Sequence, residues 1–479
     1  MEITRRTAIG ITLIALIGLT SWGLAGTLTE QQYIDAGKAE YHRGNYDAAI
    51  YLFTKGLELN PDNQYLYNDR GLCYLKEGEI EKAIEDFSKA IELDADFAGA
   101  YYDRGLAYFE KGKQNRTDPN DKAIADFSKA IELDPNFVDA YYQRGLCYSG
   151  IGHSGIHHYH KLPAEPWPTD MEDRYNRALA DFNKVLELDP NYVLAHAGLG
   201  NLFYKYYDSY EEMQKAIAEY DKALESENLI IEKVGNKGLA GVYYSRGRAY
   251  TYLGEWEQAE SDYLKAIELD PKCGIAIGHL IHLYWDWKKC SELLALANAT
   301  GRNDPSIARG VCYAELKQYD KAISDLEDPT TYEGFHGAFW GPRGKRCLAE
   351  IYRERGDEDK ARAVLEEAIN MSNKSIAKGG RTFTAYCERG LTYIDLKEYD
   401  KAISDLLKVI EEKAASDREY GHSNYYVDAH IGLVKAYLEK GEKEKAREYF
   451  EKVVELLQRP GTPRRTSVIK ELQRPGIPQ

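Results

Sequence analysis

The chain has 479 residues, of which 43% are apolar and 29% are charged. Its 62 basic and 78 acidic residues give a formal net charge of -16, which argues against nucleic acid and anionic lipid as broad partners, because both require positive charge. The 39 tyrosines, together with many aliphatic residues, supply enough apolar surface to bury a core, which argues against a disordered chain. The seven cysteines form no CxxC pair and no zinc-type Cys/His spacing.

The N-terminal region contains an apolar segment. Residues 7–26 follow Arg5 and Arg6 and carry no charge. Twenty helical residues span about 30 Å, the thickness of a hydrocarbon core. Small residues at Gly23 and Ala25 also suit signal-peptide cleavage. We therefore expect residues 1–29 to be either a transmembrane anchor or a signal peptide. In both cases the preceding arginines predict that the rest of the chain is extracytoplasmic, membrane-anchored or exported after cleavage.

A repeat of 34 residues follows this segment. In one unit, Tyr67, Gly71 and Tyr74 are spaced to share one face of a helix that ends at Gly78. A second helix follows with the same spacing of small and aromatic residues, at Ala83, Phe87 and Ala90. Prolines mark the turn after the second helix in several units, at Pro61, Pro135, Pro190 and Pro271. A single hairpin of this kind cannot bury its apolar face alone, so neighbouring units must stack.

In these residues the chain resembles the tetratricopeptide repeat (TPR) family. The resemblance implies an all-α fold, a right-handed superhelical solenoid of stacked helix-turn-helix hairpins. About eleven units begin near residues 30, 64, 98, 138, 193, 240, 274, 303, 342, 383 and 427. Residues 30–228 hold five repeats, residues 229–326 hold repeats six to eight with a linker at 229–239, and residues 342–460 hold repeats nine to eleven.

A charged pair recurs within the repeat. Six units have Arg at position seven, and the same six have Asp at position twenty-three. The co-occurrence predicts a structural ion pair between the two helices of each hairpin. The predicted pairs are Arg70 with Asp86, Arg104 with Asp126, Arg144 with Asp181, Arg246 with Asp262, Arg309 with Asp325, and Arg389 with Asp405.

Three segments interrupt or end the repeats. An insertion at 152–175 contains four histidines that are weak candidates for a metal site, at His153, His157, His158 and His160; the alternative is a solvated or partner-contacting loop. Residues 327–341 are predicted to form an aromatic, glycine-rich loop that either binds a partner or covers a break in the superhelix. Residues 461–479 are Pro-rich and basic, which predicts a flexible tail.

The resemblance also implies that the first helices line a concave groove for a peptide segment. Positions two, five, nine and twelve would face it, with position six beside them, and their Tyr, Leu and Asp would suit an apolar segment with basic flanks. The alternative is that the tyrosines pack between neighbouring repeats. The candidate groove residues are Tyr65, Asn68, Asp69, Leu72, Tyr102, Asp103, Leu106, Tyr142, Leu146 and Tyr244. The Lys/Asn/Arg clamp by which some relatives hold a C-terminal carboxylate is absent from these positions.

No nucleotide-binding, metalloprotease or serine-hydrolase motif is present, so neither an enzyme nor a cofactor is predicted. The sequence favours a protein-interaction scaffold or adaptor of the assembly-factor or co-chaperone type. The alternative is a metal- or small-ligand-binding module that uses the histidine-rich insertion.

Overall fold

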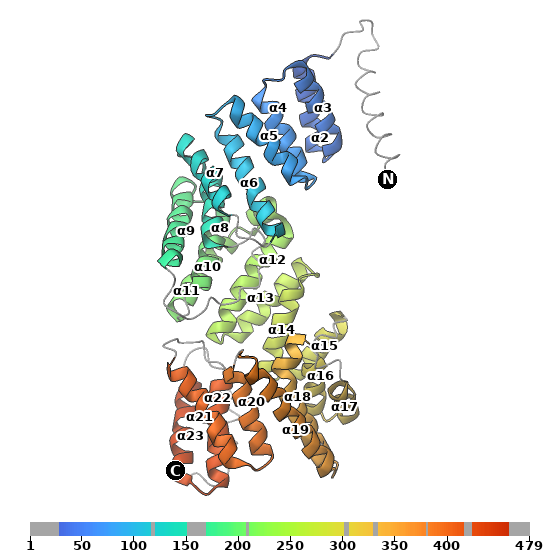
Figure 1. Cartoon of the computed structure of the whole chain (residues 1–479), viewed down its shortest axis with the longest axis vertical. Helices are drawn as coiled ribbons and strands as arrows, with labels where there is room; N and C mark the ends of the chain where they lie inside the picture. The colour runs from blue at the N-terminus through green and yellow to red at the C-terminus, as the bar shows by residue number, and fades with distance from the viewer. Residues whose placement is uncertain are drawn as a thin grey trace. The chain divides into compact units, whose positions relative to one another are not determined.

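The computed structural model describes residues 28–115, 120–150, 169–206, 210–300, 306–328, 334–379, 382–415 and 424–458. All regular secondary structure in these ranges is helical (Figure 1). None of the helices in these ranges combines the length and apolarity needed to cross a bilayer. The apolar segment at 7–26 and the tail at 461–479 lie outside the described residues.

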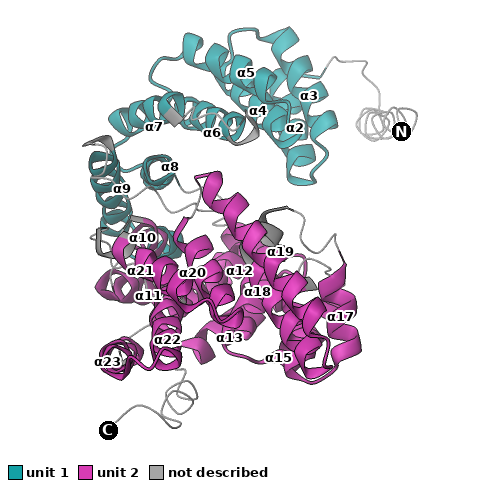
Figure 2. Ribbon diagram, turned by 60° about the horizontal axis from the view of Figure 1, so that its bottom comes forward, with its two compact units in different colours: residues 1–153, 168–198 teal, residues 154–167, 199–479 magenta. Residues whose placement is uncertain are grey.

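The described chain divides into two compact units (Figure 2). Unit 1 comprises the described residues up to 198, and unit 2 those from 199 onward, so that the boundary falls within α10 (Val193–Tyr206). The other helices of unit 1 are α2 (Glu30–His42), α3 (Tyr46–Leu59), α4 (Gln64–Lys76), α5 (Ile80–Leu93), α6 (Ala98–Asn115), α7 (Asn120–Leu133), α8 (Val138–Ser149) and α9 (Thr169–Leu188).

Unit 2 continues the alternation of first and second helices. It contains α11 (Tyr210–Leu224), α12 (Glu227–Leu253), α13 (Trp256–Leu269), α14 (Gly274–Asp286), α15 (Cys290–Thr300), α16 (Ser306–Glu315), α17 (Tyr319–Glu327), α18 (Gly334–Glu354), α19 (Glu358–Ala377), α20 (Thr382–Asp395), α21 (Tyr399–Ala415), α22 (Asn424–Glu439) and α23 (Lys443–Gln458). In both units, most helices that are consecutive in the chain pack as antiparallel hairpins and then against the next hairpin. The predicted all-α array of stacked hairpins is confirmed.

Close approach of the two helices depends on a glycine facing an aromatic ring. A Cβ atom added to Gly71 in α4 would lie 2.7 Å from Phe87 Cε1 in α5. Phe87 is fully buried at this contact, and Gly105 faces Phe127 in the same way in the next hairpin. The ring therefore packs on bare backbone, which brings the hairpin helices close enough to exclude water.

The first helix ends in the same hydrogen-bonded turn in several repeats. Gly78 has φ +80°, its N–H donates to Leu75 O at 3.2 Å, and the N–H of Glu79 donates to Tyr74 O at 2.9 Å. This is the Schellman arrangement, which favours glycine at the left-handed position. Three repeats place lysine there instead, at Lys288 (φ 57°), Lys317 (φ 58°) and Lys397 (φ 62°).

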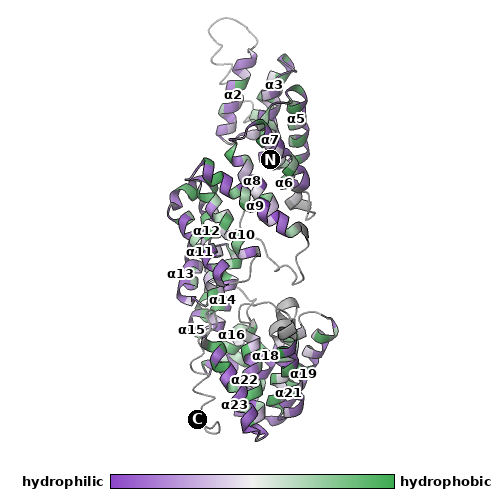
Figure 3. Ribbon diagram, turned by 90° about the vertical axis from the view of Figure 1, so that its left-hand side faces the viewer, coloured by the Kyte–Doolittle hydropathy of each residue, from purple (hydrophilic) through white to green (hydrophobic). Residues whose placement is uncertain are grey.

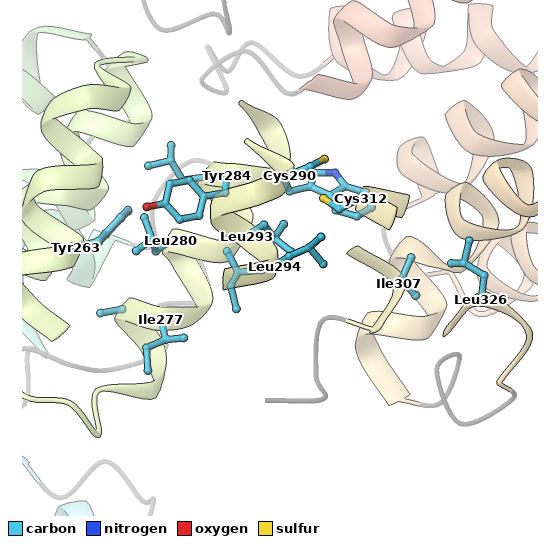
Figure 4. Close-up of a cluster of buried hydrophobic side chains, with 14 of the residues drawn as sticks. Tyr263, Ile277, Leu280, Tyr284, Cys290, Leu293, Leu294, Ile307, Cys312 and Leu326 are labelled. Atoms are coloured by element: carbon cyan, nitrogen blue, oxygen red, sulfur yellow. The ribbon is translucent and has the colours of Figure 1, made fainter. Parts of the chain in front are cut away.

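The core of unit 2 runs through several hairpins rather than ending within one. Figure 4 shows Tyr263 of α13, Leu280 of α14, Leu293 of α15 and Ile307 of α16 within one buried cluster. Along the helices, hydrophobic residues are interleaved with hydrophilic ones, as expected for two-helix units that bury one side (Figure 3). Each hairpin therefore depends on its neighbours to complete its core.

The structure differs from the sequence prediction at three connections. The predicted linker at 229–239 is part of α12, which is interrupted only at Gly235, where φ is 70° and ψ is 179°. The predicted loop at 327–341 is helical from Gly334, where α18 begins. The insertion ends earlier than predicted, because α9 begins at Thr169. In α18 the glycines signalled a loop, yet helix packing against α19 overrides these weak local preferences, and the helix also accommodates Pro342.

Candidate functional site: the first-helix face of unit 1

All six Arg–Asp pairs expected from the repeat are present in the structure. Nε and Nη2 of Arg70 each donate to one carboxylate oxygen of Asp86 at 2.8 Å. The other five pairs have the same two-point geometry at 2.6–2.9 Å: Arg104–Asp126, Arg144–Asp181, Arg246–Asp262, Arg309–Asp325 and Arg389–Asp405. Burial raises the pKa of Asp86, while Arg70 opposes that rise. These pairs lie between the helices and are structural.

The same arginines also contact the preceding repeat. Nη1 of Arg70 donates to Thr54 Oγ1 in α3 at 3.1 Å, and Nη1 of Arg104 donates to Ser88 Oγ in α5 at 3.2 Å. This contact was missed by sequence reasoning, although a hydroxyl side chain sixteen residues before Arg70, Arg104 and Arg144 was available as its signal. The pairs of these three arginines therefore set the geometry both within a hairpin and between hairpins.

A second set of polar residues lies on the first helices of unit 1. Helices α2, α4, α6 and α8 contact one another in chain order. Their shared surface, which we call the first-helix face, consists of Lys38, Tyr65, Asn68, Asp69, Tyr102, Asp103, Tyr142 and Gln143.

Most of the predicted groove residues are less exposed than the sequence suggested. Tyr65 is 56% exposed, whereas Asn68, Leu146 and Tyr244 are buried. Leu72 and Leu106 pack against the clusters around Phe87 and Phe127.

Aromatic stacking between successive repeats explains this burial. The ring centroid of Tyr102 lies 4.8 Å from that of Phe137, which immediately precedes α8. Tyr142 is placed likewise at 5.2 Å from Tyr192, which precedes α10. Tyr102 and Tyr142, which are half-buried, therefore fit the alternative expected from the sequence, in which the rings pack between neighbouring repeats.

Two carboxylates on this face have little compensating positive charge. Asn68 Nδ2 donates to Asp103 Oδ2 at 2.8 Å, and Lys38 Nζ lies 3.6 Å from Asp69 Oδ2. Burial raises the pKa of Asp103 to about 6; Asp69 adds to the rise, and Asn68 and Lys76 oppose it. Burial also raises the pKa of Asp69, against the effect of Lys38. Unlike Asp86, neither carboxylate has a two-point arginine contact among the described residues.

Two buried amide oxygens of the same face lack donors. Asn68 Oδ1 and Gln143 Oε1 have no hydrogen-bond partner among the described residues. Both residues are more than nine-tenths buried, with 7% and 8% of their surface exposed. A buried acceptor without a donor costs about 1–3 kcal/mol, so the face is rich in acceptors that remain to be satisfied.

One first helix of unit 2, α18, carries arginines at the corresponding positions. The Arg343 guanidinium lies 4.9 Å from the centre of the Trp285 ring. Arg346 in α18 bridges to Asp395 at 2.6 Å and to Glu388 at 3.5 Å, both in α20. Sequence reasoning missed these residues, although Arg343 and Arg346 occupy positions two and five of the ninth repeat, the same positions that were considered in unit 1.

Within the described ranges, no group of three or more His, Cys, Asp or Glu side chains is arranged to hold a metal ion. The four histidines at 153–160 lie outside those ranges. A metal site in the insertion therefore remains a prediction.

Two-helix hairpins that stack in chain order, with a glycine–aromatic contact in several of them, define a helical-repeat protein. Family models described as "TPR repeat" match residues 71–112, 120–152 and 172–205. Models described as "Tetratricopeptide repeat" match 52–85, 240–273, 348–375, 383–416 and 427–456. Together they match more than half of the chain. The chain belongs to the tetratricopeptide repeat family.

Similar proteins share only parts of this chain. Tetratricopeptide repeat protein 37 of Xenopus laevis is 24% identical over 305 residues, which are 60% of this chain and 18% of that protein. Hsp70-Hsp90 organizing protein 1 of Glycine max is 30% identical over 219 residues, 44% of this chain and 34% of that protein. The chain thus spans about a third of the length of these relatives or less. The crystal structure of MamA matches 40% of this chain and 94% of its own at 26% identity, with a TM-score of 0.31.

Proposed function

We propose that this protein is an interaction adaptor whose first-helix face in unit 1 receives a segment of a partner protein. The observation that carries the proposal is the set of buried acceptors Asn68 Oδ1 and Gln143 Oε1 beside the carboxylates Asp69 and Asp103. A folded protein rarely leaves such groups unsatisfied without a purpose. Similarity to Hsp70-Hsp90 organizing protein 1, whose name describes a role with other proteins, supports a protein as the partner.

The chemistry of the face favours a segment with basic and apolar residues. Asp69 and Asp103 would repel an acidic tail, whereas Tyr65 offers an exposed ring to an apolar side chain. The net charge of -16 would draw a basic partner toward the protein over longer distances.

Site-specific photocrosslinking in cells tests this proposal. A photoreactive phenylalanine analogue replaces Tyr65 in the full-length chain, and linked peptides are identified by mass spectrometry. Leu264, which is 46% exposed on the second helix α13, is the matched control position. We expect one partner to recur at position 65 and not at position 264. If the same proteins are linked from both positions, or none recurs, the first-helix face is not the binding surface.

We also propose that residues 7–26 direct the chain to or through a membrane, so that the repeats are extracytoplasmic. The support for this proposal is the uncharged run after Arg5 and Arg6. Protease added to intact cells or spheroplasts should degrade the repeats if the proposal is right. Protection that is lost only on lysis would show that they are on the cytoplasmic side.

A further inference from the structure

Asp69 and Asp103 differ from every Asp in the six Arg–Asp pairs in what compensates their charge. Asp86 receives two donors from one arginine at 2.8 Å. Asp103 accepts a hydrogen bond from the neutral amide of Asn68. Asp69 has only Lys38, whose Nζ lies 3.6 Å away and whose side chain is 54% exposed. Asp69 therefore adds to the raised proton affinity of Asp103, and the lysine beside Asp69 is solvated.

Asn68 supplies an independent indication of a ligand. Its Nδ2 donates to Asp103, which places the amide group at the carboxylates and leaves Oδ1 as an acceptor. Oδ1 is buried and has no donor among the described residues. The cluster thus has three acceptor groups, two carboxylates and an amide oxygen, while its donors are the Asn68 amide N–H and the exposed Lys38 ammonium. A ligand that satisfies it must supply several N–H donors and a positive charge.

Tyr65 adds an aromatic surface beside these acceptors. It lies one helical turn before Asp69 in α4, is 56% exposed, and packs edge-on against Phe97 with 5.2 Å between ring centroids. The chain already holds its own arginines in this way: Arg70 binds Asp86, and its guanidinium lies 5.5 Å from the centre of the Tyr67 ring. Carboxylate plus tyrosine is therefore a combination that this fold uses repeatedly to hold a guanidinium.

We propose that Asn68, Asp69 and Asp103, with Tyr65 beside them, form a subsite for one arginine or lysine side chain of the partner segment. The side chain places its cationic group between the carboxylates, donates to Asn68 Oδ1, and lays its methylene stem on the Tyr65 ring. Lys38 is displaced toward solvent. The subsite rests on the proposed function, because it specifies which feature of the partner segment is recognised.

Selection from a peptide library tests the subsite on the full-length protein in detergent. The probe is a library of 12-residue peptides that are randomised at every position. We expect the wild-type chain to enrich peptides with arginine or lysine at one position relative to neighbouring apolar residues. An individual selected peptide should bind at least 10-fold more weakly when that residue is replaced by norleucine.

Asp69→Asn and Asp103→Asn should each abolish this 10-fold preference while the norleucine peptide keeps its affinity. Asp62→Asn, an exposed residue in the turn before α4, is the matched control and should retain the preference. Thermal unfolding of each variant shows that it is folded.

The selection also distinguishes failure of the subsite from failure of the proposed function. The subsite would be overturned if the selected peptides showed no preference for arginine or lysine, or if that preference survived in both Asp69→Asn and Asp103→Asn. Either result would leave the proposed function standing. Failure of the wild-type chain to enrich any peptide would overturn the proposed function, and the subsite with it.

Discussion

Each Arg–Asp pair places two opposite charges between the helices of a hairpin, where water has little access. The carboxylates of these pairs are nearly buried, and each arginine makes its third contact to the preceding repeat where a hydroxyl is present there. A buried pair of this kind contributes little net stability compared with apolar residues of the same size, but breaking it leaves a charge without a partner. The pair therefore specifies the spacing of the helices more than it adds stability.

Arg104→Met should destabilise the hairpin of α6 and α7 by about 3–5 kcal/mol, because Asp126 would stay buried without its arginine. The double variant Arg104→Met, Asp126→Leu should recover most of that loss. Urea unfolding followed by circular dichroism measures both effects. Arg362→Met, which removes an exposed bridge to Glu366, should change stability by less than about 0.5 kcal/mol. An equal loss in the single and double variants would show that the arginine acts through packing.

In the protein without a bound partner segment, Asp103 should lower the free energy of unfolding as pH rises. Its folded pKa is about 6, above the ordinary value of 3.8, so between these values the folded chain holds a proton that the unfolded chain has released. The stability from this protonation is complete below about pH 4 and is lost as pH rises through 6. Asp103→Asn should therefore stabilise the chain by about 2 kcal/mol at pH 7.5 and by almost nothing at pH 3.5.

Unfolding curves at the two pH values check this prediction. Asp62→Asn controls for the loss of one negative charge on an exposed residue. A constant difference between Asp103→Asn and wild type across this range would contradict it. If Asp103→Asn gains stability and also loses the basic preference described above, the carboxylate is retained for binding at a cost in stability.

At the scale of the element, most helices begin and end where local sequence indicates. The Schellman turn after α4 has glycine at its left-handed position, as the repeat pattern predicts. The turn after α20 has the same two hydrogen bonds, from Lys397 N–H to Ile394 O at 2.9 Å and from Glu398 N–H to Tyr393 O at 2.8 Å. Packing of α20 and α21 therefore imposes a left-handed residue even where the sequence has lysine.

Lys397→Gly should stabilise the turn by about 0.5–1 kcal/mol, because glycine adopts φ 62° without a Cβ clash. Lys378→Gly is the matched control: Lys378 is also exposed at a helix C-terminus, but its φ is -76°. Glycine there should destabilise the chain by up to about 1 kcal/mol. Thermal unfolding separates the two variants by the sign of the shift, and a shift of the same sign in both would contradict the backbone explanation.

Predictability also differs between elements. The hairpin helices follow from a 34-residue pattern in which small and aromatic residues recur at helical spacing. The predicted linker at 229–239 and most of the predicted loop at 327–341 are helical instead. Their glycines signalled breaks, but only Gly235 takes a non-helical conformation within α12. Local preferences of this size are smaller than the packing energy of a neighbouring helix.

At the scale of the whole molecule, the main helix contacts in the described parts of each unit run between neighbouring hairpins. Within each unit, helices pack against those adjacent in the chain or one repeat away. Stability in such arrays is approximately the sum of terms for each repeat and each interface between repeats. A local defect should therefore stay local.

Hydrogen exchange followed by mass spectrometry tests this locality. In Arg104→Met, exchange should accelerate in α6 and α7 and in the adjoining α5 and α8. Peptides from α20 and α21 in unit 2 should exchange as in wild type. In Arg389→Met, exchange should instead accelerate in α20 and α21 and stay as in wild type in α6 and α7, because its partner Asp405 lies in α21. Faster exchange throughout the chain in either variant would mean that the array unfolds as one cooperative block.

The sequence by itself determined the repeat, its register and the Arg–Asp pairs. These features recur at the same positions in several units, so each occurrence supports the others. The pairs join helices of one hairpin, whose geometry the repeat itself specifies.

Tertiary structure decided which side chains remain accessible on the first-helix face. Tyr102 and Tyr142 are stacked on residues of the following repeat, while Tyr65 keeps an exposed ring. It also decided that Asn68 turns its amide to Asp103 in the next repeat and leaves one acceptor without a donor. The physical reason is that exposure and hydrogen-bond satisfaction depend on atoms of neighbouring repeats, which helical periodicity within one repeat does not specify.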